Sequence, residues 1–119
     1  MDVLNTIRMG TPTPGAGVAV YQAFTAEVIL TFFLVAAVFG TAVHLKAPRV
    51  GGLFIGLAVA LDIMAGGPIS GGAMNPARHF GPAMLGGGTE YIWLYWSAPL
   101  LGGLLAAIFH KVCLAGSEK

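Results

Sequence analysis

Long apolar stretches alternate with short polar breaks along this chain, and three of the stretches are long enough to cross a membrane. The first runs from about Val18 to Val43, which is about 39 Å as an α-helix at 1.5 Å per residue. The second runs from about Val50 to Ala65, and the third from about Tyr91 to Val112. The hydrocarbon core of a bilayer is about 30 Å thick, so the pattern predicts three transmembrane helices, 18–43, 50–65 and 91–112.

The two ends of the chain are different in character from the spans. Residues 1–17 are mixed polar and rich in proline and glycine, and they contain no apolar run of the kind a signal peptide needs. Within them, Asp2–Met9 is predicted to form a short interfacial helix. Residues 113–119 are predicted to be a C-terminal tail.

Between the second and third spans lies GGPISGGAMNPARHFGPAMLGGG, residues 66–88. Pro76 suits the first position of a helix and Asn75 suits the capping position before it. A helix over 76–85 is about 15 Å long, half the hydrocarbon core. The glycine-rich chain before it has no helical periodicity, and such backbone is tolerated at membrane depth only inside protein or facing water. We therefore predict a re-entrant loop at 66–88, with a half-helix whose positive end lies near mid-membrane.

Composition narrows the class of protein. Charged residues are 9% of the 119, hydrophobic residues are 56%, and mean hydropathy is +0.81, whereas an average soluble domain is about 25% charged. This excludes a soluble enzyme and a disordered chain, and a net charge of +1 excludes a basic nucleic-acid binder. The single cysteine, Cys113, excludes a disulfide framework and a thiolate metal site. We expect an all-α membrane protein surrounded by lipid, with no cofactor, no metal and no nucleic-acid partner.

Small residues recur every four positions on two of the predicted spans. Gly52, Gly56 and Ala60 form one such stripe. On the third span the same spacing joins Gly102 with Ala106 and Gly103 with Ala107. Small residues let helix backbones approach closely in a membrane, so both stripes predict helix packing.

One segment of the sequence matches a known family. GPISGGAMNPARHFGPA resembles the second asparagine-proline-alanine loop of the aquaporins, AEVILTFFLV resembles the family's fourth helix, and YIWLYWSAPLLGGLLAA its sixth. DIMAGGPISGG is most similar to the branch of animal aquaporin-8 and the plant tonoplast proteins. The resemblance covers about residues 10–112. It implies half of the aquaporin inverted-repeat fold and a passive channel, not an enzyme, for water and small neutral solutes such as ammonia, hydrogen peroxide or glycerol.

The resemblance also implies roles for individual residues. The pore motif is Asn75, Pro76 and Ala77, with the Asn75 amide donating to passing water. The implied selectivity filter consists of Arg78, Ile63, Gly72 and, from a second chain, Ile55. Backbone carbonyls of Gly71, Gly72 and Ala73 would line one wall of the pore. Glu27 would accept hydrogen bonds from backbone N–H groups of the loop.

Two further polar residues fall inside the apolar region. His79 could titrate near neutral pH, but we expect it to be hydrogen-bonded or to face outward. Asp62 lies next to Ile63, and we expect a structural role for it.

Assembly is the open question, because the resemblance covers only the second half of an aquaporin. Two antiparallel copies would complete one pore, and a four-pore particle would then hold eight chains. The alternatives are a separate first-half partner and a non-conducting modifier subunit. Four cations on one side (Lys46, Arg49, Lys111, Lys119) against Arg8 on the other place the N-terminus outside, which opposes insertion in both orientations. The expected location is the cell membrane, as an integral multi-pass protein.

Overall fold

The computed structural model describes residues 3–114, and over that range it contains helices and no strand. Three helices are long and apolar enough to cross a membrane: Val20–Val43, Gly51–Ser70 and Ile92–Leu114. The first is α2 (Val20–Val38) with a π-helical turn, the second is α3 (Gly51–Ser70), and the third is α5 (Ile92–Phe109) with a second π-helical turn. The predicted all-α class with three spans is confirmed.

Short elements complete the chain. Before the first span lie α1 (Val3–Thr6) and one 3₁₀ turn, Arg8–Gly10. Between the second and third spans lies α4 (Pro76–Pro82), which continues as a π-helical turn over Ala83–Gly87.

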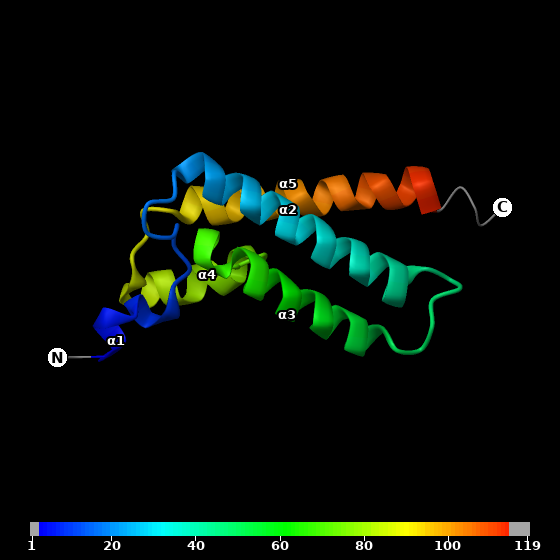
Figure 1. The fold of residues 1–119 in the computed structure, drawn as a ribbon, viewed down its shortest axis with the longest axis horizontal. Coiled ribbons are helices and arrows are strands. Elements are labelled where there is room, and N and C mark those ends of the chain that lie inside the picture. The colour runs from blue at the N-terminus through cyan, green and yellow to red at the C-terminus, as the bar shows by residue number, and fades with distance from the viewer. Residues whose placement is uncertain (1–2, 115–119) are drawn as a thin grey trace.

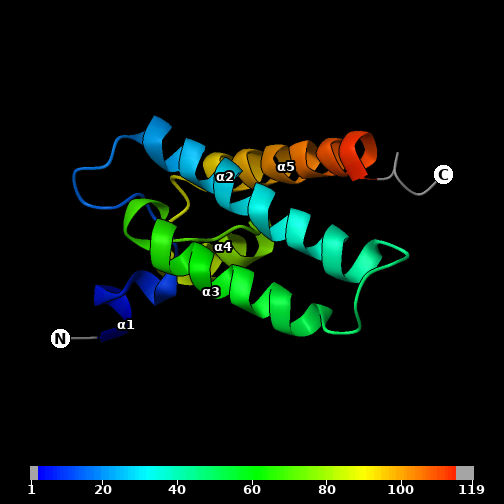
Figure 2. The ribbon, with the colours of Figure 1, turned by 45° about the vertical axis from the view of Figure 1, so that its right-hand side comes forward.

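Helix α2 is the centre of the bundle. It packs against both α3 and α5, while α3 and α5 make no comparable contact with each other within the described residues. Helix α1 and the last turn of the third span lie at opposite ends of the long axis (Figure 1). The short α4 lies against α5 at the end that carries the N-terminal segment, and the turned view in Figure 2 shows the same arrangement.

Small residues set how closely the helices approach α2. A Cβ atom added at Gly102 of α5 would collide with the Val28 carbonyl of α2 and lie 3.0 Å from Thr31 Cβ. A Cβ at Gly66 of α3 would collide with the Leu30 side chain. The Gly102–Ala106 stripe is buried as predicted. The other stripe is not used in this way: Gly52, Gly56 and Ala60 are exposed, and a Cβ at either glycine would meet nothing within 4 Å.

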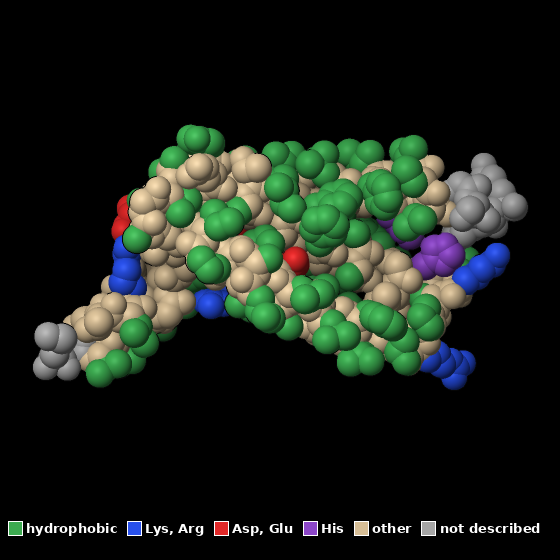
Figure 3. Space-filling view, viewed as in Figure 1, with side chains coloured by type: hydrophobic (Ala, Val, Ile, Leu, Met, Phe, Trp, Pro, Cys, Tyr) green, Lys and Arg blue, Asp and Glu red, His purple; other side chains and the backbone are tan. Residues whose placement is uncertain are grey.

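Most large apolar side chains of the three long helices face outward. Figure 3 shows hydrophobic side chains over most of the visible face, with Lys and Arg toward its two ends. On α3 alone the exposed apolar side chains include Leu53, Phe54, Leu57, Leu61 and Met64. This distribution suits lipid, where an apolar surface needs no burial against protein. The buried apolar cluster is small and lies beside the re-entrant loop: Ala23, Ala73, Leu94 and Tyr95.

Two boundaries differ from the sequence prediction. Helix α3 continues past Ala65 to Ser70, through Pro68. Pro68 removes one N–H from the helix ladder and its ring crowds the carbonyl four residues earlier, but continuing the helix keeps the other backbone groups of this stretch paired at membrane depth. The half-helix is α-helical only to Pro82, after which the chain unwinds to a π-turn ending beside Gly86, whose φ is 118°. The irregular chain between α3 and α4 is therefore limited to Gly71–Asn75.

The N-terminal segment is also more than an isolated interfacial helix. Its helical part is α1, and the chain that follows packs on the re-entrant loop. Gly15 N–H donates to the Ile69 carbonyl at 2.9 Å, and a Cβ at Gly71 would lie 2.9 Å from Pro12 Cα. Asp2 from the predicted helix, and residues 115–119 of the predicted tail with Lys119, lie outside the described residues.

The close approach at Gly102 generates a stability prediction. Gly102→Val should lower the free energy of unfolding by about 1–3 kcal/mol, because added atoms would press against the α2 backbone. Detergent or SDS unfolding followed by circular dichroism measures this. The matched control is Gly56→Val, the same exchange in a helix where a Cβ meets nothing within 4 Å. Equal losses in the two variants would contradict the packing described here.

Candidate functional site

The loop that joins α3 to α4 is a tight turn that needs glycine. Gly71 and Gly72 have φ of 85° and 61°, in the left-handed region that favours glycine. Met74 has φ of 56°, an uncommon conformation for a residue with a side chain. Gly71 N–H closes α3 by donating to the Gly67 carbonyl at 2.8 Å. The turn reverses the chain between the end of α3 and the start of α4.

Glu27 of α2 holds this turn from behind. Its carboxylate accepts hydrogen bonds from the N–H groups of Ala73 at 2.9 Å and Met74 at 2.7 Å, and from Ser70 Oγ at 2.7 Å. The Glu27 side chain is fully buried. A buried carboxylate is costly without partners, and here three donors surround it, two of them from a backbone that has no other way to satisfy its N–H groups.

Ser70 and Tyr95 extend the support, and both are fully buried. Ser70 Oγ accepts from Gly72 N–H at 3.3 Å, and the Ser70 carbonyl accepts from the Tyr95 hydroxyl of α5. Sequence reasoning gave neither residue this role, because the partners of Tyr95 and Glu27 lie 25 and 43 residues away along the chain, and no local pattern signals such pairs.

Asn75 caps α4. Its Oδ1 accepts from Ala77 N–H at 2.8 Å and from Arg78 N–H at 3.4 Å, and Pro76 occupies the first helical position. The residue is exposed. Capping uses only the oxygen, so the two Nδ2–H donors stay available, and within the described residues they have no hydrogen-bond partner.

Arg78 lies one turn further along α4 and is exposed. Its Nη1 donates to the Gly10 carbonyl of the N-terminal segment at 3.2 Å. A guanidinium in a membrane protein is costly unless it is hydrated or bonded. Among residues 3–114 the Arg78 guanidinium has one hydrogen-bond partner, the Gly10 carbonyl, and the side chain is otherwise exposed.

The remaining predicted filter residues are placed on α3 and the loop. A Cβ at Gly72 would lie 3.5 Å from Ile63 Cα and Cγ1, so these two predicted residues are neighbours. Ile55 is eight residues before Ile63 on the same helix, about 12 Å along its axis. Within one chain the structure does not bring Ile55 to the other predicted filter residues.

His79 differs from expectation. It is 1% exposed, and neither ring nitrogen has a hydrogen-bond partner among the described residues, so the predicted bonded or outward-facing histidine is wrong. Its ring stacks on Tyr95 with centroids 4.2 Å apart and planes at 11°. Stacking on the residue that supports the Ser70 carbonyl explains why it faces inward.

Asp62 is also buried, and its Oδ2 has no partner among the described residues. Over residues 3–114 no group of three or more His, Cys, Asp or Glu side chains is arranged to hold a metal ion. The site is thus built from one glycine-rich turn, a capped half-helix, and a buried carboxylate behind them.

Comparison with known proteins shows which family the chain belongs to. The family model described as Major intrinsic protein matches residues 3–110. The chain belongs to the major intrinsic protein family. It is 42% identical over 111 residues to aquaporin TIP2-3 of Arabidopsis thaliana, covering 89% of this chain and 44% of that protein. It is 46% identical over 101 residues to aquaporin TIP4-4 of Zea mays, covering 81% of this chain and 39% of that one.

The chain spans less than half the length of these curated aquaporin relatives. Membership of the family agrees with the predicted half-aquaporin fold, with a multi-pass location in a membrane, and with the prediction that the chain is not an enzyme.

The contacts of Glu27 generate a prediction for this aquaporin-family loop. Glu27→Ala should destabilise the protein by about 2 kcal/mol or more, because two buried N–H groups lose their acceptor. Glu27→Gln should cost less, since one oxygen remains. Amide hydrogen exchange should quicken at Ala73 and Met74 in both variants. Thr25→Ala, at an exposed position of the same helix, is the control. Unchanged exchange at those two amides in Glu27→Ala would contradict the role assigned to Glu27.

Proposed function

We propose that this chain forms a passive transmembrane pathway for water and small uncharged solutes, with each pore built from two antiparallel copies. No nucleotide, metal ion or ion gradient is required. The observation that carries the proposal is the capped half-helix: α4 begins at an exposed asparagine whose amide donors have no partner among the described residues.

Asn75 is the proposed water donor. A water molecule that accepts from the Nδ2–H groups presents its oxygen to the half-helix. The N-terminal end of a helix carries about half a positive charge, which reinforces that orientation, disfavours proton relay, and repels cations. Pro76 and Ala77 complete the motif by starting the helix at this point.

Arg78, Ile63 and Gly72 are the proposed filter. The exposed guanidinium of Arg78 donates to neutral solutes and repels cations, while Ile63 leaves one side apolar. The carbonyls of Gly71, Gly72 and Ala73 are the proposed acceptors of the wall. Supporting this, the N–H groups of Gly72, Ala73 and Met74 are bound to Ser70 and Glu27, on the side of the loop that faces α2. With no aromatic residue in this filter, we propose ammonia, hydrogen peroxide and glycerol as solutes beside water.

Two copies are proposed because one half-helix covers only half the membrane. A second α4 from the opposite face would bring two Asn75 side chains together at the centre, and Ile55 of the second copy would complete each filter. Closed two-fold pairing is the commonest way for identical chains to associate, and four such pores would hold eight chains. A separate first-half partner in the same membrane is the second candidate, favoured by the unequal charges at the two ends; a non-conducting modifier is the third.

Water flow through the purified chain tests the function. Proteoliposomes that hold this chain alone should shrink faster than empty liposomes in stopped-flow osmotic shifts, and should show no proton or potassium leak. Asn75→Ala, at equal reconstituted amounts, should flow more slowly because the central donors are lost. Permeability equal to that of empty liposomes would contradict the two-copy pore, and a cation leak would contradict the electrostatic role of the half-helix.

Orientation tests the assembly and the proposed cell-membrane location. In a Cys113→Ser background, Leu45→Cys and Thr89→Cys place single thiols at exposed positions near opposite ends of the bundle without changing its charges. With an impermeant reagent on intact cells, about half of each variant should react. Full labelling of one and none of the other would favour a separate first-half partner. No labelling of either would exclude the cell membrane.

A further inference from the structure

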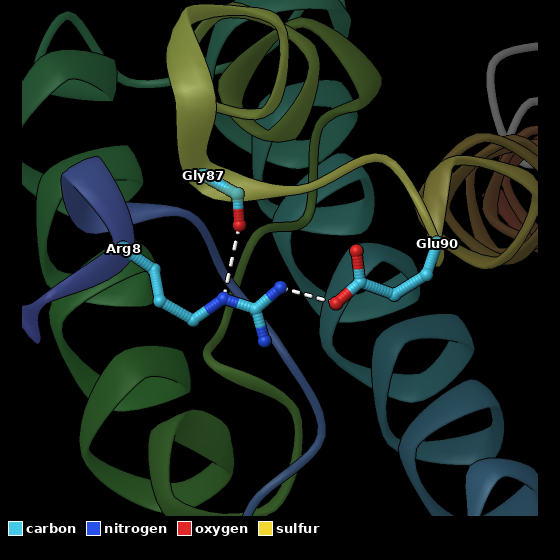
Figure 4. Close-up of polar contacts among 3 residues, drawn as sticks. All are labelled: Arg8, Gly87 and Glu90. Carbon is cyan, nitrogen blue, oxygen red and sulfur yellow. Dashed lines mark hydrogen bonds and ion pairs between the residues drawn. The ribbon is translucent and has the colours of Figure 1, made fainter. Parts of the chain in front are cut away.

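Residues 8–15, which we name the N-terminal strap, lie across both ends of the re-entrant segment. At one end, Arg8 Nε donates to the Gly87 carbonyl at 2.9 Å and Arg8 Nη2 pairs with the Glu90 carboxylate (Figure 4). At the other end, Gly15 N–H donates to the Ile69 carbonyl at 2.9 Å. The strap therefore connects the end of α3 to the chain that enters α5.

Glycine at the α4–α5 junction permits this contact. A Cβ at Gly87 would collide with Thr11 Oγ1 and lie 2.5 Å from the Arg8 carbonyl, and a Cβ at Gly88 would collide with Arg8 Nη2. Gly88 also has φ of 104°, a conformation that side chains rarely adopt. The glycines at 87 and 88 thus have a second use beyond ending the half-helix: they make room for the strap.

The strap carries the fixed partner of Arg78. The Gly10 carbonyl that accepts from Arg78 Nη1 lies two residues from Arg8. The backbone between them is set by unusual angles, with φ of 49° at Arg8, 56° at Met9 and 74° at Gly10. Because the turn is this short, the position of Gly10 follows from where Arg8 is held.

We propose that Arg8 and Glu90 are positioning residues for Arg78. By fixing the strap at Gly87 and Glu90 they keep the Gly10 carbonyl on the Arg78 guanidinium, and so set the width of the filter at this mouth of the pore. This inference rests on the proposed channel function. It identifies two selectivity-determining residues that lie outside the asparagine-proline-alanine motif and outside the filter.

The opposite charges of Arg8 and Glu90 favour a stable contact between them. The hydrogen bond from Arg8 holds the pKa of Glu90 below the usual range of a glutamate. A lowered pKa means that the pairing is fully present at neutral pH and is lost only as the pH falls below that range. The ion pair alone is half-exposed and would be weak. The second bond, from Nε to a backbone carbonyl, is what makes Arg8 more than a surface partner, and a lysine could not make both bonds in this geometry.

The test uses the ratio of glycerol to water permeability, which does not depend on how much protein is reconstituted. Arg8→Ala, Arg8→Lys and Glu90→Gln should each raise this ratio about threefold to tenfold, the factor that one ordinary hydrogen bond gives. Gly87→Ala should raise it too, since it displaces the strap while both charges remain. Arg49→Ala, which removes an exposed cation at the opposite end, should leave it unchanged.

A double-variant experiment separates positioning from general loosening. If the strap acts through Arg78, then Arg8→Ala in an Arg78→Ala background should add no further change to the ratio. A conducting wild type whose ratio is unaltered by Arg8→Ala, or altered equally in both backgrounds, would overturn the inference. An absence of water flow in the wild type would instead overturn the proposed function.

If the wild type shows no water flow, the positioning of Arg78 by Arg8 can still be tested by a measurement that needs no conduction. In lipid nanodiscs, the guanidinium signal of Arg78 in nitrogen-15 NMR should show restricted motion in the wild type and averaged motion in Arg8→Ala. The Arg49 signal is the internal reference. Equal mobility of Arg78 in the two proteins would overturn the inference.

Discussion

The re-entrant loop depends on one buried carboxylate. Backbone that leaves helical form at membrane depth has N–H groups that neither lipid nor a neighbouring turn can satisfy. Glu27 accepts two of these groups and the Ser70 hydroxyl at once. The dependence is mutual, since the same donors are what stabilise a charged group at a fully buried position. Loop shape and carboxylate are therefore one structural unit.

That unit gives the loop two different sides. The N–H groups of residues 72–74 are bound toward α2 and the end of α3. The polar groups of Asn75 and Arg78 lie on the exposed side. Tyr95 and His79, stacked on each other, join α5 to both the loop and the half-helix. The buried hydrogen bonds of the loop therefore lie behind it, and Asn75 and Arg78 lie on its exposed side.

Sequence reasoning succeeded where the signal was local. The three spans follow from apolar length, and the start of α4 follows from an asparagine cap next to a proline at the first helical position. It failed where the signal was long-range or absent. The glycine-rich stretch after Ala65 suggested an end to the second span, but α3 continues to Ser70 with Pro68 inside it. Long-range contacts account for the inward ring of His79, for the support from Ser70 and Tyr95, and for the strap contacts of Arg8. A separate failure concerns the stripe at Gly52, Gly56 and Ala60, which is exposed: small-residue spacing alone does not select a packing partner.

The separation of 43 positions between Glu27 and Ser70 sets an order of events during synthesis. At about 5–20 residues per second, about 2–9 s separate the appearance of the carboxylate from that of its first loop donor. During this interval α2 is a nascent span carrying an acid whose permanent ligands do not yet exist. The donors of Glu27 belong to residues 70–74, so the loop can close around it only once α3 has been synthesised, and α5, which brings the Tyr95 hydroxyl, follows later still. The last long helix to be made, α5, therefore stabilises a turn that α2 and α3 have already formed.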